Sequence, residues 1–250
     1  MAHELQNANL WKRFASRLFD NALVAVLAVL IGIPLSGLLG YDRYSDAMDR
    51  AYEAYETRYG VRFDISQEEY MALDEATQVY YDQAWEALMA DEETKQAYNM
   101  MLVLSLAAIS LGVLAAVILW ELVVPLLLGH GRTLGTKIFG LCLVRVDGVK
   151  VNVFQLFTRA ILGKYAVETL IPILILMMML LRGAMGVVGP AVLFALLCGQ
   201  VACLLFTRNH SAIHDLIAGT AVVDYTSQTI FETAEERIEY QNDRSAGADY

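Results

Sequence analysis

Four long apolar stretches separate the polar segments of the chain. They lie at about 18–40, 100–128, 161–181 and 186–206. A helix needs about 20 apolar residues to cross the hydrocarbon core of a bilayer. The pattern therefore predicts four transmembrane helices, and the long polar lead before the first favours an uncleaved helix over a signal peptide.

The polar segment between the first two stretches has the periodicity and capping residues of helices. One predicted helix, "SDAMDRAYEAYETRYG", is closed by Gly60. Ser66 and Glu69 form a capping box that begins a second helix over 66–90. Asp91 can cap a third helix that continues into the second apolar stretch. This segment is either a solvated helical hairpin with packed tyrosines or a surface that docks a partner or collects cations.

The segment after the second apolar stretch alternates as strands do. In "LCLVRVDGVKVNV", Asp147 and Gly148 separate two β-prone runs, which is a hairpin signal. The run "TAVVDY" near residue 220 can add a third strand. An open sheet edge is not tolerated in lipid, so we expect this small sheet at or beyond the inner membrane face.

Composition agrees with a membrane protein and gives it an orientation. The 250 residues are 57% hydrophobic and 18% charged, against about 25% charged in soluble domains. Residues 41–98 hold fifteen acidic and five basic residues, a net −10 that equals the charge of the whole chain. The segment between the second and third apolar stretches instead holds Arg132, Lys137, Arg145, Lys150, Arg159 and Lys164 against one acid. Because basic loops stay in the cytoplasm, both termini are predicted to be cytoplasmic.

Catalytic and metal-binding patterns are missing from the sequence. The three cysteines make no disulfide framework, and no Cys/His cluster has ligand spacing. There is no G-x-S-x-G motif, and "GRTLGTK" departs from a P-loop in spacing and ending. We expect no enzymatic activity, no cofactor, no metal and no nucleic-acid partner.

Charged residues at the start of the first apolar stretch lie on one face of the predicted helix. Arg13, Arg17 and Asp20 are spaced 0, 4 and 7. Arg17 and Asp20 can pair directly, and Lys137 or Arg159 could also serve as partner of the aspartate. The arginines set the orientation of the helix, and the aspartate is expected to be paired.

Further acids lie in apolar surroundings, and they form a candidate ion or proton site with Asp20. These are Glu121 in the second stretch, Glu168 in the third and Asp215 after the fourth. Glu168 follows Lys164 by four residues, the spacing of a helical ion pair. Buried carboxylates can exchange protons near neutral pH. The alternative is a structural charge network that joins the helices to the inner sheet.

The segment "GRTLGTKIFG" reads as an amphipathic element at the membrane interface. Arg132 and Lys137 are the candidate contacts with lipid phosphates, and the apolar side chains between and after them face the acyl chains. The lipid bilayer is thus the first expected partner.

Several blocks, in order, resemble the RDD family of bacterial membrane proteins. They are "RFASRLFDNAL", "ELVVPLLLGHGRTLGTKIFGLCLVRVDG", "LFTRAI" and "SAIHDLIAGTAVV", covering residues 11–40 and about 118–224. The resemblance makes Arg13, Asp20 and Asp215 the signature residues. It departs from the family pattern at Lys137, which follows the second glycine of "GRTLGTK" one position later than usual. The family implies a membrane fold; transport of ions or small ligands has been proposed for it, and sodium/proton exchange suggested for some members.

Together these observations predict an all-α membrane protein of the bacterial plasma membrane. We expect a four-helix transmembrane bundle with both termini cytoplasmic, an extracytoplasmic helical insertion and a small cytoplasmic β-hairpin or sheet. The predicted divisions are 1–40, 41–98, 99–225 with a cytoplasmic linker at 129–160, and a polar tail at 226–250.

Two functions remain open from the sequence. One is proton-coupled transport of a cation or small solute through the membrane-embedded carboxylates. Four helices are few for a transporter, so transport predicts a homo-oligomer. The other is a scaffold or accessory subunit that recruits a protein partner through the 41–98 hairpin.

Overall fold

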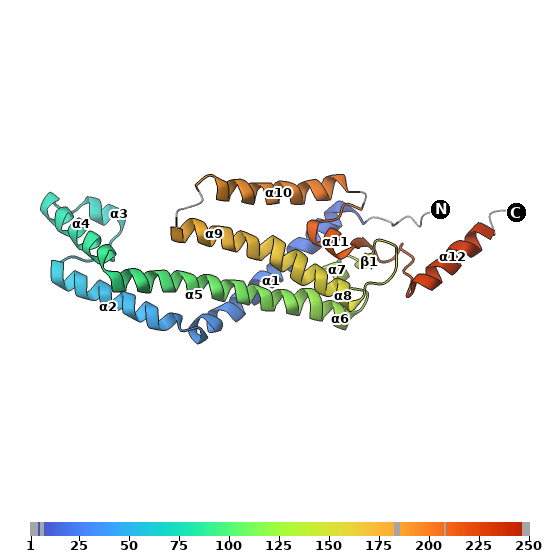
Figure 1. Cartoon of the computed structure of the whole chain (residues 1–250), viewed down its shortest axis with the longest axis horizontal. Helices are drawn as coiled ribbons and strands as arrows, with labels where there is room; N and C mark the ends of the chain where they lie inside the picture. The colour runs from blue at the N-terminus through green and yellow to red at the C-terminus, as the bar shows by residue number, and fades with distance from the viewer. Residues whose placement is uncertain (1–4, 6–7, 183–185, 208, 247–250) are drawn as a thin grey trace. The chain divides into compact units, whose positions relative to one another are not determined.

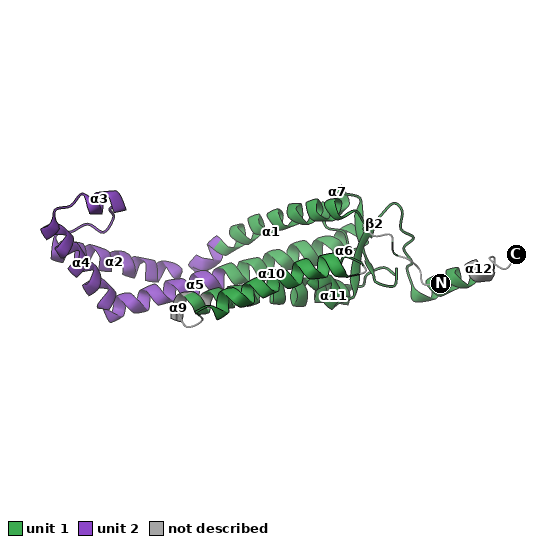
Figure 2. Ribbon diagram, turned by 90° about the horizontal axis from the view of Figure 1, so that it is seen from above, with its two compact units in different colours: residues 1–32, 109–250 green, residues 33–108 purple. Residues whose placement is uncertain are grey.

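The computed structural model describes residues 5, 8–182, 186–207 and 209–246. The outermost residues of the predicted N-terminal stem and C-terminal tail lie outside this range. The chain divides into two compact units, residues 1–32 with 109–250 and residues 33–108 (Figure 2). Each unit is described by itself below, and the four predicted domain boundaries stay a prediction.

Among the described residues, three helices are long and apolar enough to cross a membrane. They are α1 (Leu10–Leu38), the continuous helix Glu92–Leu128, and α10 (Val188–Phe206). The continuous helix comprises α5 (Glu92–Val117), the π-helix η1 (Ile118–Val123) and α6 (Val124–Leu128). Three of the four predicted spans are therefore confirmed as helices of sufficient length and apolarity.

The remaining predicted span, the third stretch at 161–181, has an unusual helical structure. It consists of a long π-helix, η2 (Thr158–Leu170), followed by α9 (Ile171–Arg182). Helix α9 lies beside α10 in both ribbon views (Figures 1 and 2). A π-helix is rare beyond a single turn and is frequent at functional sites. The spanning role of 158–182 stays a prediction.

Unit 2 is built from short polar helices. Helix α2 (Tyr41–Tyr59) ends, as predicted, at Gly60, whose φ of 66° is the left-handed conformation that glycine adopts readily. The predicted helix over 66–90 is in fact two helices, α3 (Gln67–Met71) and α4 (Glu75–Ala90). The prediction failed because Asp74 accepts a hydrogen bond from the Thr77 backbone at 3.0 Å and starts a new helix. The Ser66 capping box is present.

Aromatic side chains, most of them half-buried, form a cluster in unit 2. The Phe63 ring contacts the rings of Tyr52, Tyr81 and Trp85, with centroids 5.6 to 5.8 Å apart. These rings join α2 to α4, and the predicted packing of tyrosines in this segment is confirmed. Asp91 accepts from the Thr94 backbone at 2.9 Å and caps the start of α5, also as predicted.

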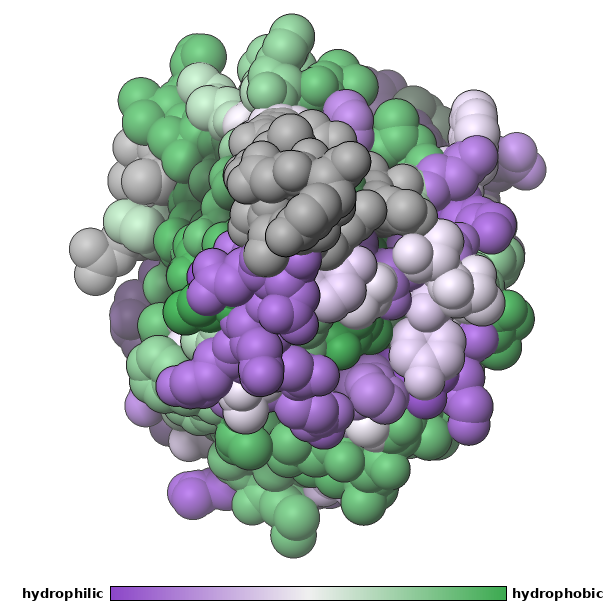
Figure 3. All heavy atoms as spheres, turned by 90° about the vertical axis from the view of Figure 1, so that its right-hand side faces the viewer, coloured by the Kyte–Doolittle hydropathy of each residue, from purple (hydrophilic) through white to green (hydrophobic). Residues whose placement is uncertain are grey.

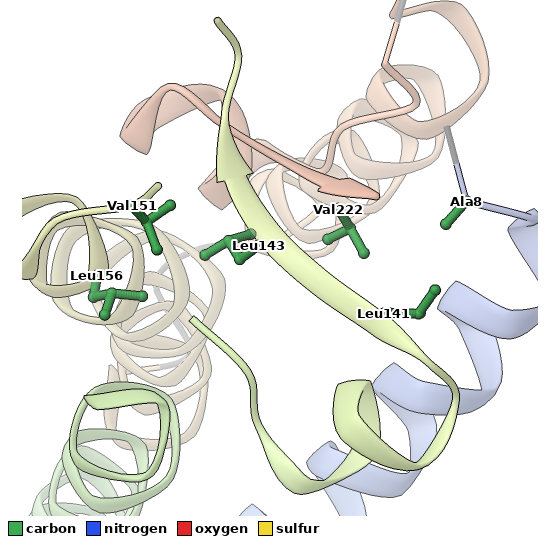
Figure 4. Packing of buried hydrophobic residues seen from close by; sticks show 6 residues of the cluster. All are labelled: Ala8, Leu141, Leu143, Val151, Leu156 and Val222. Carbon is green, nitrogen blue, oxygen red and sulfur yellow. The ribbon is translucent and has the colours of Figure 1, made fainter. Parts of the chain in front are cut away.

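The small sheet in unit 1 has two strands. Strand β1 (Leu141–Arg145) pairs antiparallel with β2 (Thr220–Asp224), with Leu143 opposite Val222. Figure 4 shows these two side chains beside each other in an apolar cluster that also holds Ala8, Leu141, Val151 and Leu156. The sheet therefore has a buried apolar face.

The predicted hairpin around Asp147 and Gly148 is wrong in its second strand. The turn forms, since the Gly148 backbone donates to the Arg145 carbonyl at 2.9 Å. After it, only isolated bridges at Val149 and Lys150 remain. The chain then leaves the sheet because Asn152 caps the next helix, α8 (Val153–Phe157), in a capping box with Gln155.

Short helices complete unit 1. These are α7 (Leu134–Ile138), α11 (Ile213–Ala218) and the polar α12 (Ala234–Ala246). Figure 3 looks at the molecule from the end where Figure 1 labels α12, and hydrophilic residues there form a band between hydrophobic areas. In chain order, α7 lies between α6 and β1, and α11 lies between α10 and β2. Both helices carry residues of the candidate functional site.

Candidate functional site

Arg159, on η2, is the centre of a buried set of ion pairs. Its Nε donates to Oδ1 of Asp215 and its Nη1 to Oε2 of Glu121, both at 2.8 Å. Lys164 donates to the other oxygen of Glu121. The Glu121 and Asp215 side chains are 2% and 3% exposed. Two acids predicted for one site, Glu121 and Asp215, are thus joined by a single guanidinium.

Two cations of η2 reach one acid. Arg159 and Lys164 lie five residues apart on this helix, whose hydrogen bonds run from residue i to i+5, and both donate to Glu121. The predicted pair of Lys164 with Glu168, four residues on, is wrong. Glu168 contacts His214 and Arg17 instead.

His214 links Glu168 to the same set of charges. Its Nδ1 lies 2.7 Å from Oε1 of Glu168, and Nη2 of Arg17 lies 2.7 Å from Nδ1 and 2.9 Å from Nε2. Because the acid can only accept at Nδ1, we assign a neutral ring that donates to Glu168 from Nδ1 and accepts from Arg17 at Nε2. Burial, followed by the charges of Arg17 and Arg159, lowers the pKa of His214 well below its ordinary value. The ring is therefore uncharged at neutral pH.

Asp215, which follows His214 on α11, is stabilised in its charged form, whereas His214 is stabilised in its neutral form. Burial of Asp215 opposes its ionisation, but the charge and hydrogen bond of Arg159 outweigh this and lower the pKa of the carboxyl. We call the set Arg17, Glu121, Arg159, Lys164, Glu168, His214 and Asp215 the charge network.

Arg13 and Arg17, on α1, have different partners. Arg13 donates to the backbone carbonyls of Asn209 and His210 at 2.9 and 2.8 Å, in the turn between α10 and α11. Arg17 reaches His214 and lies 3.7 Å from Oε2 of Glu168. The predicted pairing of Arg17 with Asp20 is wrong, because Arg17 extends instead to the buried groups of α11 and η2.

Asp20 is held by neutral donors. It accepts from Trp120 Nε1 at 2.9 Å, from Thr133 Oγ1 at 2.5 Å and from the Gly135 backbone at 2.9 Å. In the described part of the chain no ion pair joins Asp20 to Lys137 or Arg159, so these predicted partners are also wrong. Three N–H and O–H donors satisfy a buried carboxylate without a cation, and they fix α1 to the "GRTLGTK" segment.

Two glycines allow this close packing. A Cβ on Gly135 would lie 2.5 Å from the Ser16 carbonyl oxygen and 2.6 Å from Oδ2 of Asp20. A Cβ on Gly163 would overlap His214. Gly135, the second glycine of "GRTLGTK", is therefore required for the approach of α1, and Gly163 is required for the approach of α11 to η2.

The two predicted lipid contacts lie in different environments. Lys137 is exposed in the last turn of α7. The Arg132 guanidinium instead lies over the Tyr225 ring, 4.3 Å from its centroid. Contact of either residue with lipid phosphates stays a prediction.

A cavity of about 390 Å³ adjoins the charge network, and we call it the network cavity. Ligand pockets commonly have volumes of roughly 300 to 1,000 Å³. Its polar lining comes from several segments: Arg13, Arg17, Asp20, Glu121, Arg159, Lys164, His214 and Asp215. The signature residues Arg13, Asp20 and Asp215 therefore line one cavity, whereas Glu168, a member of the charge network, does not line this cavity.

Sequence reasoning overlooked several residues of the site. The sequence does not predict that Trp120 and Thr133 bind Asp20 or that His214 binds Glu168 and Arg17, and it suggests Arg159 only as a partner of Asp20. Trp120 precedes the buried Glu121, and His214 precedes Asp215, so neighbours of a predicted buried acid would have been a useful signal. In the described residues, no group of three His, Cys, Asp or Glu side chains is close enough to hold a metal ion.

Apolar helices of membrane-spanning length, with a buried charge network between them, define an integral membrane protein. The model of the RDD family matches residues 7–219. The chain belongs to the RDD family, whose members are membrane proteins. Searches of curated proteins and of solved structures found no significant match.

Proposed function

We propose that this protein transports a small solute and that the network cavity is its binding site. One observation carries the proposal: residues of α1, η1, η2 and α11 bring eight ionisable side chains to a single cavity. Ionisable residues within membrane-spanning segments are costly, and they commonly mark substrate or ion pathways. The proposed function is not enzymatic.

Ion pairs that share partners can rearrange, which a transport cycle needs. Glu121 is shared by Arg159 and Lys164, and Arg159 is shared by Glu121 and Asp215. A solute that binds one member frees its partner to pair elsewhere or to exchange a proton. A bare cation would have to displace Arg159 or Lys164 from an acid, so proton-coupled cation exchange is the more demanding form of this proposal.

The proposed topology has four membrane spans with both termini in the cytoplasm of a bacterium. The uninterrupted helical run of η2 and α9 supports a crossing at 158–182. The basic 129–160 linker and the acidic 41–98 segment support the orientation. In this topology the network cavity lies toward the cytoplasmic leaflet, so a homo-oligomer or a conformational change completes the pathway.

Currents from proteoliposomes on a solid-supported membrane test the proposal. The panel is sodium, potassium and lithium chloride, sodium phosphate and octyl phosphate, each against empty liposomes. We expect a current with at least one solute that is lost in Asp20→Asn and Asp215→Asn. Lys150→Gln, which breaks an exposed pair with Glu232, is the matched control and should keep the current.

Two results would contradict transport through this cavity. The first is that protein which unfolds cooperatively and is correctly oriented gives no current with any of the solutes. The other is a current that persists in both aspartate variants.

The scaffold role is the second candidate, and the hairpin supports it. Several of its apolar and aromatic side chains are exposed, among them Met71, Val79 and Tyr80, beside many acids. Deleting 43–96 and closing the gap with a short linker separates the two functions. A scaffold should lose a co-purifying partner on deletion, whereas a transporter should keep its currents.

A further inference from the structure

The network cavity has an apolar wall as well as a charged end. Leu10, Trp11 and Phe14 of α1 and Leu205 of α10 line it, and they are 47%, 78%, 60% and 57% exposed. Both helices are candidate membrane spans. Side chains that line a cavity and are also exposed on membrane helices form a wall that lipid chains can reach. The apolar part of the cavity is thus suited to an alkyl chain.

The charged end of the cavity has spare hydrogen-bond donors. A guanidinium has five N–H groups, and the contacts of Arg13 with the Asn209 and His210 carbonyls use two of them. Arg17 uses only Nη2 in the contacts found among the described residues, and its side chain is 27% exposed. Both arginines therefore have donors left for a ligand.

The acids at the same end have their partners already. Glu121 accepts from Arg159 and Lys164, Asp215 accepts from Arg159, and Asp20 accepts three hydrogen bonds. Four basic residues line the cavity against three acids. The group that best complements this end is an acceptor with negative charge.

We propose that the network cavity binds an amphiphile with one alkyl chain and an anionic head group, a phosphate or a carboxylate. The head group lies at Arg13 and Arg17, and the chain lies along Trp11, Phe14 and Leu205. This inference rests on the proposed function and names the class of solute. Because the wall is formed by exposed residues of α1 and α10, the amphiphile enters from the membrane.

Quenching of tryptophan fluorescence tests the inference with the full-length protein in maltoside detergent. Trp85→Phe leaves two tryptophans, Trp11, which lines the cavity, and Trp120, whose Nε1 donates to the cavity-lining Asp20. The probe is 8-bromooctyl phosphate. The comparison probes are 8-bromooctyl trimethylammonium, which has the same chain with a cationic head, and inorganic phosphate as an unbrominated competitor.

We expect saturable quenching by the phosphate probe and only weak background quenching by the ammonium probe. Unbrominated octyl phosphate should displace the probe, and inorganic phosphate should compete at least about tenfold less well. Arg13→Gln should weaken binding by at least about tenfold, since it removes charge-assisted hydrogen bonds. Lys12→Gln is the matched control, because Lys12 pairs with Asp224 and does not line the cavity; it should bind as the native chain does.

Three results would overturn the inference. Equal quenching by the ammonium probe would show that the head group is not selected. Equal competition by inorganic phosphate would show a site for a free anion without a chain. Unchanged binding in a folded Arg13→Gln variant would place the head group elsewhere. The comparison of probes uses unaltered arginines, so it stands even if Arg13→Gln does not fold.

Failure of this inference and failure of the proposed function are distinguishable. Saturable binding of the phosphate probe without any current would keep the site and reject transport. Currents with an inorganic solute, together with no head-group selection in the quenching assay, would keep transport and reject the amphiphile.

Discussion

The charge network and the 41–98 hairpin use the same kinds of residue in opposite ways. Hydrogen bonds between members of the network join residues 38 to 197 positions apart, and its acids Glu121 and Asp215 are almost fully buried. Polar side-chain contacts of the hairpin join residues 3 to 12 positions apart, as in the Lys95–Glu92 pair and the Tyr70–Asp82 bond. The hairpin holds more charge, but the network connects more of the chain.

The difference shows where charge determines the fold and where it solvates a surface. A buried acid that loses its partner keeps the full cost of desolvation. An exposed pair is screened by water and contributes about 0 to 1 kcal/mol. Substitutions in the network should therefore have large effects, and comparable substitutions in the hairpin should have small ones.

The largest effect is expected from Arg159→Gln. It leaves Glu121 and Asp215 without their shared cation, which should lower the free energy of unfolding by about 3–5 kcal/mol. Thermal unfolding in detergent measures this. Arg145→Gln, which removes the more exposed partner of Asp147, should cost no more than about 1 kcal/mol. Equal stability of the two variants would show that the network does not hold the helices together.

Gly135→Ala should have the next largest effect. Its Cβ would lie 2.5 Å from the Ser16 carbonyl oxygen, and such overpacking costs about 1–3 kcal/mol. Gly199→Ala in α10 is the control, because its Cβ meets only Ile213 at 4.0 Å and alanine favours a helix by up to about 1 kcal/mol. Opposite changes in the unfolding temperature are expected. A stabilised Gly135→Ala variant would contradict the close approach of α1 to α7.

The network should also make stability depend on pH through His214. Burial and the charges of Arg17 and Arg159 lower the pKa of His214 in the folded chain. Below a pH of about 6.5 the unfolded chain takes up a proton that the folded chain does not. The free energy of unfolding therefore decreases as the pH is lowered, by up to about 1.4 kcal/mol per pH unit. Unfolding temperatures between pH 7.5 and 5 measure this slope. His214→Gln should flatten it, and an unchanged slope would assign the effect to other groups.

The smallest effect is expected in the hairpin, from Ser66→Ala. Ser66 accepts from the Glu69 backbone at 3.2 Å in the capping box of α3. Loss of such a cap costs about 1 kcal/mol, confined to a five-residue helix. Hydrogen exchange of the α3 amides measures it, with exposed Gln67→Ala as the control. Loss of protection in the network from Ser66→Ala would contradict the contrast between the two regions.

The sequence predicted the local features of both regions well. Three of the long helices, the Gly60 end of α2 and the caps at Ser66 and Asp91 follow from patterns within a few residues. The signature residues Arg13, Asp20 and Asp215 came from the resemblance; the structure places all three in the lining of one cavity, and their functional role stays a prediction. The break between α3 and α4 was not predicted. Asp74 caps α4 as Ser66 caps α3, but it lies within an otherwise continuous helical pattern.

The partners of the charged residues could not be predicted in the same way. Spacing along an α-helix suggested pairs of Arg17 with Asp20 and Lys164 with Glu168. In the fold, Lys164 of η2 pairs with Glu121, and Arg17 contacts His214 of α11. Such choices depend on which elements meet in space, and a periodic pattern carries no information about that.

The most direct test of the central claim is a comparison of solute-driven currents from three proteins in proteoliposomes. They are the native chain, the chain lacking 43–96, and the full chain with Asp215→Asn. The account predicts currents from the first two and none from the third, because the solute binds at the charge network. Loss of current on removing the hairpin, with full current from a folded Asp215→Asn variant, would contradict it.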